Sequence, residues 1–80
     1  MRLTLTKAKE LKHGDVLHHK QRENADGTPE RWRVNGKVKR WKRDTNRIEV
    51  PLKRGLYDYG YLTNYMFTPG GICMAYELPS

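Results

Sequence analysis

The sequence has little of what would indicate a secreted, membrane-bound or disulfide-linked protein. Its 80 residues contain one cysteine, Cys73, so no disulfide can form within the chain. No window approaches the roughly 18 apolar residues of a membrane span, and the first apolar residues alternate with polar ones instead of forming the h-region of a signal peptide. We therefore expect a cytoplasmic protein in which Cys73 is a small buried side chain.

Signatures of catalysis and metal binding are also missing from the sequence. No Ser-His-Asp or Cys-His arrangement stands in a recognisable setting, and Gly70-Gly71 lacks the lysine and the helix of a phosphate-binding loop. His18 and His19 are adjacent, so on a strand they point to opposite faces and cannot share a metal ion. We expect no enzyme activity, no cofactor and no metal site.

What the chain does have is positive charge in one central segment. Its formal net charge is +7. Residues 31–54 hold ten Lys/Arg and two acidic residues, a net charge of +8, whereas residues 1–30 carry +1 and residues 55–80 carry −2 without any Lys/Arg. Such clustering can be the electrostatic footprint of a polyanion partner. A surface that only keeps the protein soluble gives the same pattern.

The central segment RWRVNGKVKRWKRDTNR, residues 31–47, contains an Asn-Gly pair that favours a tight β-hairpin. A hairpin at Asn35-Gly36 would place Trp32 and Val34 on the same face as two lysines. A continuous strand instead separates an apolar face from a basic face, which is the period-2 pattern of a half-buried strand. We therefore predict one strand over residues 31–39.

Two irregularities are expected around this strand. Gly36 falls on the inner face, where it suits a sharp bend or a bulge. The alternation then fails at Arg40 and Trp41, because Arg40 would point inward and Trp41 outward; we assign this failure to a second bulge and leave the direction of Trp41 open. The polar run 42–46 is the predicted turn.

The rest of the chain alternates in the same way and is punctuated by turns every 8–14 residues. This spacing predicts an all-β fold, a small five-stranded antiparallel barrel that forms one domain over residues 1–80. The expected strands cover 14–21, 31–39, 47–53, 56–62 and 72–78; a short strand could begin at 3–5, residues 6–13 could form one helical turn or a loop, and residues 63–67 could form a single 3₁₀ turn. The predicted core is Leu17, Trp32, Val34, Val38, Ile48, Val50, Leu52, Leu62, Ile72 and Met74.

Two runs of sequence resemble SH3-like barrels. LKHGDV, residues 11–16, looks like the first strand entry of that fold. GKVKRWKRDTNRIEV, residues 36–50, is similar to the KOW motif, in which a Gly-Lys strand is followed by a polar turn with Asn and then a β-branched strand. The usual second glycine is absent, and Lys39 and Arg40 stand where it would be. The matching residues are Gly36, Lys37, Val38, Asn46, Ile48 and Val50.

The resemblance covers about half of the chain and implies an SH3-like (KOW- or Tudor-like) barrel and nucleic-acid binding. The whole chain also resembles short phage and bacterial proteins of unknown function, which adds no function here.

The basic residues form the predicted binding site. If the strand at 31–41 pairs with the strand at 47–53, their cations lie on one side of one sheet and can neutralise phosphates. The predicted nucleic-acid-binding residues are Arg31, Arg33, Lys37, Lys39, Arg40, Lys42, Arg43, Arg47, Lys53 and Arg54.

Aromatic residues could add to this site. Tyr57, Tyr59 and Tyr61 alternate along one predicted strand, where they could stack on bases or form a cage for a cation. The sequence favours a third interpretation, in which the three rings pack in the core and cover an edge. Trp41 could also stack on a base, if it points outward.

These features favour a noncatalytic module that binds DNA or RNA, mostly through phosphates and with low sequence specificity. The alternative is a protein-interaction module, such as a phage-type factor that docks on an acidic protein surface with Trp41 as its anchor. We expect no membrane partner. Exposed strand edges would allow two chains to pair, so a dimer is compatible with the sequence.

Overall fold

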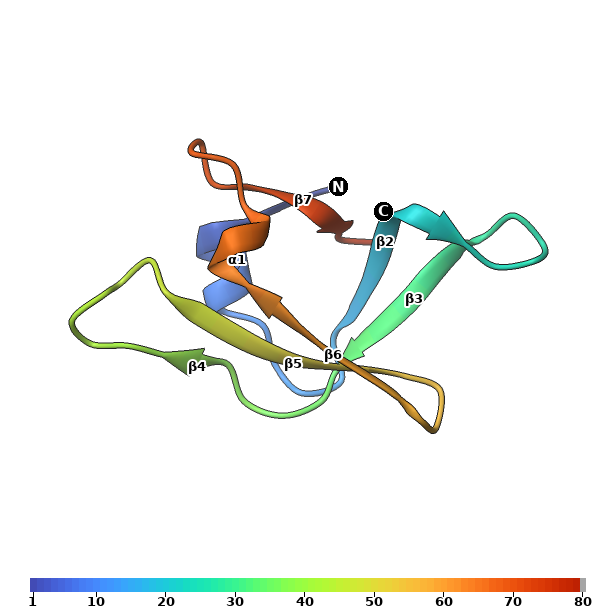
Figure 1. The fold of residues 1–80 in the computed structure, drawn as a ribbon, viewed down its shortest axis with the longest axis horizontal. Helices are drawn as coiled ribbons and strands as arrows, with labels where there is room; N and C mark the ends of the chain where they lie inside the picture. Colours follow the sequence, from blue (N-terminus) through green and yellow to red (C-terminus); the bar gives the residue numbers. More distant parts are fainter. Residues whose placement is uncertain (80) are drawn as a thin grey trace.

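Alternating apolar residues build one antiparallel sheet that curls into a half-barrel, as the computed structural model in Figure 1 shows for residues 1–79. The strand order is β1-β7-β2-β3-β5-β4, and β6 pairs with the other edge of β5. The elements are β1 (Arg2–Thr4), α1 (Leu5–Lys9), β2 (Val16–Glu23), β3 (Pro29–Val34), β4 (Lys39–Arg40), β5 (Ile48–Arg54), β6 (Asp58–Thr63), η1 (Asn64–Met66) and β7 (Ile72–Glu77).

The predicted small all-β, barrel-like fold is confirmed. Five of the seven strands overlap the ranges that the alternation predicted. The helical turn η1 falls inside the predicted range 63–67, and α1 begins one residue before the predicted range 6–13. The other two strands, β1 and β4, are only three and two residues long. Within residues 1–79, no helix is long and apolar enough to cross a membrane.

The chain does not turn back at Asn35-Gly36, as predicted, but the single strand predicted over residues 31–39 is interrupted, because β3 ends at Val34 and β4 begins at Lys39. β3 and β4 follow one another along the same edge of β5, both antiparallel to it. Val34 pairs with Leu52, and Lys39 pairs with Glu49. Val34 and Lys39 are five residues apart, whereas their partners on β5, Leu52 and Glu49, are three residues apart. Two extra residues therefore bulge out between β3 and β4.

This position of the bulge corrects the second predicted irregularity. Gly36 lies in the bulge with a φ of +130°, a conformation that favours glycine. Because two extra residues leave the alternation of faces unchanged, Arg40 pairs directly with Ile48 in regular register. A bulge at Arg40-Trp41 is therefore wrong: Arg40 has the inward parity but lies exposed at the end of the sheet, and Trp41 follows it outside the core cluster.

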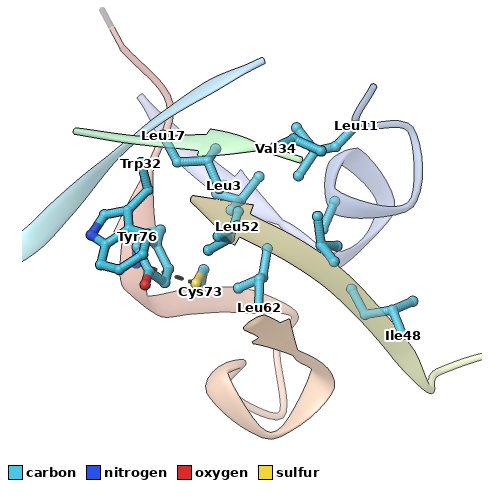
Figure 2. Packing of buried hydrophobic residues seen from close by; sticks show 12 residues of the cluster. Leu3, Leu11, Leu17, Trp32, Val34, Ile48, Leu52, Leu62, Cys73 and Tyr76 are labelled. Atoms are coloured by element: carbon cyan, nitrogen blue, oxygen red, sulfur yellow. Dashed lines mark hydrogen bonds between the residues drawn. The ribbon is translucent and has the colours of Figure 1, made fainter. Parts of the chain in front are cut away.

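The core fills the concave side of the sheet (Figure 2). Seven of the ten predicted core residues are buried, and Val38 and Ile72 are half-buried. Met74 was predicted to be buried but is 49% exposed. The buried hydrophobic residues are Leu3, Ala8, Leu11, Leu17, Trp32, Val34, Ile48, Val50, Leu52, Leu62, Cys73 and Tyr76.

An irregular strand explains the error at Met74. Two pairs join β1 to β7, Arg2–Glu77 and Thr4–Ile72. Their members are two residues apart on β1 and five residues apart on β7, so β7 contains three extra residues. Strict alternation is therefore lost in β7, and the buried residues Cys73 and Tyr76 lie three positions apart. The backbone N–H of Tyr76 donates to Cys73 Sγ at 3.4 Å within this segment. The prediction that Cys73 is buried is confirmed.

Candidate functional site

Pairing between strands decides which basic residues share a face. Trp32 points into the core, so its neighbours Arg31 and Arg33 lie on the outer face of β3. Arg33 pairs with Lys53 of β5, and Lys53 pairs with Tyr59 of β6. Cross-strand partners share a face, so Arg33, Lys53 and Tyr59 form a row across three strands on the outer side of the sheet.

Two members of this row, Arg33 and Lys53, line a hollow of about 520 Å³, which we call the basic groove. Its lining comes from β3, from the end of β5 and the turn that follows it, and from the segment before β2. Figure 1 shows how β3 and the β5–β6 hairpin run apart from one another. No Asp or Glu contributes to its lining among residues 1–79. The lining residues are His13, Val16, Arg31, Trp32, Arg33, Val34, Asn35, Lys53, Arg54, Gly55 and Leu56.

Three of the groove cations are not neutralised by acidic side chains. The two salt bridges found in residues 1–79 both belong to Arg54, and neither involves Arg31, Arg33 or Lys53. Lys53 instead places its ammonium 5.3 Å from the centre of the Tyr59 ring, within the range of a cation–π contact. The groove therefore presents concentrated positive charge to solvent.

Arg54 differs from its neighbour Lys53. Its guanidinium lies 3.1 Å from the Asp58 carboxylate and 3.7 Å from that of Glu30. Glu30 is 8% exposed and also accepts a hydrogen bond of 2.8 Å from the indole N–H of Trp32. Although Arg54 lines part of the groove, two carboxylates already balance its charge, so the structure separates it from the other predicted cations.

The remaining predicted cations are spread beyond the groove. Lys39 shares the outer face with Glu49, its partner on β5, and Arg40 has the opposite parity. Lys37, in the bulge, and Lys42 and Arg43, in the loop before β5, are exposed. The ten basic residues therefore do not form one unbroken face, because the bulge and the loop divide them.

Trp41 packs against two of these cations. The Arg47 guanidinium lies 4.1 Å from the centre of the indole ring, and the Lys39 ammonium lies 5.0 Å from it. The ring is half-buried and is not part of the core cluster. Its direction, left open by the sequence, is outward, but both cations already occupy positions against its ring.

The three alternating tyrosines are exposed, so the core-packing interpretation is wrong. Tyr57 is 87% exposed, Tyr59 63% and Tyr61 55%. The opposite face of β6 packs inward instead, through the fully buried Leu62 and through Gly60. A Cβ atom on Gly60 would lie 3.6 Å from the Trp32 ring, so glycine lets the indole lie close to the strand.

Sequence reasoning missed one further exposed aromatic residue, Tyr65, which lies in η1 with an exposed fraction of 84%. For the three alternating tyrosines of β6, the sequence did contain a signal of which face is buried. This signal is Gly60, because a glycine within a strand often marks the face on which another group approaches closely.

The histidines lie on opposite faces, as predicted. His18 pairs with Arg31 and Glu77 on the outer face. His19 Nδ1 accepts hydrogen bonds from the backbone N–H groups of Gln21 and Arg22, at 3.1 and 3.2 Å, and its ring packs edge-on against Tyr76. Burial, aided by the charge of Arg22, lowers the pKa of His19.

The acceptor role of Nδ1 fits this shift, because a protonated ring could accept neither hydrogen bond. His19 therefore has a structural role. Among residues 1–79, no group of three or more His, Cys, Asp or Glu side chains could hold a metal ion.

Comparison of the chain with protein-family models, with curated protein sequences and with solved structures found no match. The resemblance to SH3-like and KOW sequences therefore stays a prediction. Function has to be argued from the groove and the tyrosines themselves.

Proposed function

We propose that this protein is a noncatalytic nucleic-acid-binding module that holds the phosphate backbone in the basic groove. The observation that carries the proposal is the set of unneutralised cations, Arg31, Arg33 and Lys53, around a hollow whose described lining contains no acidic residue. Phosphate contacts of this kind supply affinity by releasing condensed counterions from the nucleic acid.

Low sequence specificity follows from the same arrangement. Specific readout needs side chains held in fixed directions against base edges, whereas two of the three groove cations, Arg31 and Arg33, are exposed and make no salt bridge within residues 1–79. Long cationic side chains of this kind follow phosphates wherever the backbone runs. DNA and RNA both satisfy this chemistry.

The alternative function is docking on an acidic protein surface. Leu56 favours it, because this 73% exposed side chain lies at the rim of the groove and could serve as an apolar contact. The surroundings of Trp41, the anchor expected from the sequence, disfavour this alternative, because the ring is half-buried and two cations lie against it. We therefore place nucleic acid first.

The test is titration of labelled single-stranded and duplex oligonucleotides, followed by fluorescence anisotropy at several salt concentrations. The groove variant carries Arg33→Gln and Lys53→Gln, and the control carries Lys7→Gln and Arg22→Gln, two exposed cations outside the groove. For a single strand, each lost phosphate contact lowers the salt slope of log K by about 0.7. The groove variant should therefore lose about 1.4 from the slope and the control almost nothing.

Two results would overturn the proposal. One is failure of the unmodified protein to bind any oligonucleotide at low salt. The other is equal affinity and equal slope for the groove variant and the control, since the groove would then not be the binding site. Retention of one defined acidic protein by the immobilised chain, together with the first result, would support the alternative.

A further inference from the structure

Two exposed tyrosines lie on the same face as the groove cations. Tyr59 pairs with Lys53, and Tyr61 pairs with Pro51, two residues away on each strand. Both rings are more than half exposed, and neither belongs to the core cluster. The Lys53 ammonium lies 5.3 Å from the centre of the Tyr59 ring, but that ring remains 63% exposed, unlike the half-buried ring of Trp41. We propose that the bound nucleic acid is single-stranded, with successive bases stacked on Tyr59 and Tyr61 and with phosphates on Lys53 and Arg33; this rests on the function proposed above.

The spacing of the two rings favours a single strand. Residues two apart on a strand are separated by about 6.7 Å, whereas neighbouring bases in a duplex are stacked about 3.4 Å apart. An unstacked, extended strand can place neighbouring bases on both rings. A duplex cannot, because its bases remain paired and stacked inside the helix.

The positions of the cations complement those of the rings. Lys53 and Arg33 follow Tyr59 in one row across the sheet, and adjacent strands are about 4.8 Å apart. A nucleotide whose base lies on Tyr59 can therefore rest its phosphate on Lys53 while the chain continues toward Arg33 and the groove. The nearest carboxylate on β6, that of Asp58, is already bound by Arg54.

The scaffold beneath the tyrosines is fixed before any ligand binds. β6 pairs with β5 at six consecutive positions, from Arg54–Asp58 to Glu49–Thr63. Leu62 anchors the inner face of β6 in the core, and the Trp32 ring lies against Gly60. The rings thus stand on a rigid strand, so little backbone entropy is lost when a base stacks on them. β6 pairs with no strand other than β5 in residues 1–79, so no neighbouring strand blocks the approach to the rings.

The experiment measures the affinity of the protein for a labelled oligo(dT) strand, first alone and then annealed to oligo(dA). The strand has about 12 nucleotides, a length within the range that small barrel folds cover. The test variant carries Tyr59→Thr and Tyr61→Thr, because threonine removes the ring and keeps a strong preference for strands. The matched control carries Tyr59→Phe and Tyr61→Phe, which keeps both rings. Circular dichroism melting checks that all forms remain folded.

The unmodified protein should bind the single strand more tightly than the duplex. The threonine variant should lose roughly five-fold or more in single-strand affinity for each ring, while its duplex affinity and its salt slope stay unchanged. The phenylalanine variant should bind as the unmodified protein does. The same measurements with oligo(rU) show whether RNA behaves alike.

Equal affinity for the single strand and the duplex, or single-strand binding by the threonine variant that matches the phenylalanine variant, would overturn the inference. In both cases, salt-dependent binding that needs Arg33 and Lys53 would leave the proposed function intact. Absence of any oligonucleotide binding would overturn the proposed function and, with it, this inference.

Discussion

Lys53 and Arg54 are adjacent in the sequence, and the structure gives them opposite roles. The side chain of Lys53 lies on the outer face beside Tyr59, whereas Arg54 reaches the carboxylates of Glu30 and Asp58. We compare Lys53→Met with Arg54→Met. Methionine retains much of the aliphatic length of either residue and removes one positive charge in both variants.

The Arg54→Met change should lower stability. It leaves the Glu30 carboxylate, whose side chain is 10% exposed, with the Trp32 indole as its one remaining side-chain partner within residues 1–79. Loss of a partner by a buried polar group costs about 1–3 kcal/mol. The lower part of that range applies, about 1–2 kcal/mol, because the Arg54 side chain is 40% exposed and its pair with Asp58 is screened by solvent. The Arg54 Nε has no hydrogen-bond partner in the described part of the chain, so losing that group breaks no hydrogen bond.

The Lys53→Met change should instead affect binding. One phosphate contact to a single strand accounts for about 0.7 of the salt slope of log K, and that slope should fall by this amount. Stability should fall by only about 0.5 kcal/mol, the size of an exposed cation–π contact such as that with Tyr59.

Urea unfolding followed by tryptophan fluorescence measures the free energy of unfolding, and anisotropy titration of oligo(dT) at four or more salt concentrations measures the slope. In a domain of this size, each kcal/mol of lost stability lowers the melting temperature by about 4–8 °C. The reasoning is refuted if Arg54→Met reduces the slope as much as Lys53→Met does, or if Lys53→Met is the less stable variant.

Three further comparisons test the fold by chemical denaturation. Gly36→Ala should lower the free energy of unfolding by more than about 1 kcal/mol, because φ is +130° and the new Cβ would lie 3.2 Å from a proline ring. Gly60→Ala should be neutral or stabilise by up to about 1 kcal/mol, because its new Cβ would make an ordinary contact. Equal effects of the two changes would contradict the assigned backbone. Trp32→Ala should cost about 3–5 kcal/mol and Trp41→Ala about 1 kcal/mol or less, because only the first ring is in the core; similar losses would place both rings inside. Burial lowers the pKa of His19 below 6.5, so the unfolded chain takes up the proton more readily. The contribution of His19 to stability is therefore fully present above pH 6.5 and is lost as the pH falls through the lower pKa of this group in the folded protein. His19→Gln should reduce that fall between about pH 8 and about pH 5, and an unchanged pH profile would exclude this role.

Alternation along the chain was sufficient to predict the strands and most of the core. In β3, Trp32 and Val34 had to point inward, because the residues between them are arginines that cannot be buried without partners. The same constraint excluded a hairpin at Asn35-Gly36. Where one face of a strand is strongly charged and the other apolar, period-2 reasoning has a single solution.

β6 shows where that reasoning fails. Its two faces are Tyr57, Tyr59 and Tyr61 on one side and Asp58, Gly60 and Leu62 on the other, and neither is ruled out of the core by charge alone. The structure buries the side with Leu62, which packs in the core, and the indole of Trp32, which is distant in the sequence, lies against this same side at Gly60.

The sequence by itself determined that this is a small β protein whose positive charge lies between residues 31 and 54, because composition and period-2 alternation are properties of the chain. Only the tertiary structure decided which of those charges are paired with carboxylates. Within residues 1–79, Arg54 is paired and Lys53 is not, because the neighbours of each, Glu30 on one face and Tyr59 on the other, are brought together by strand pairing. Local sequence does not encode that pairing.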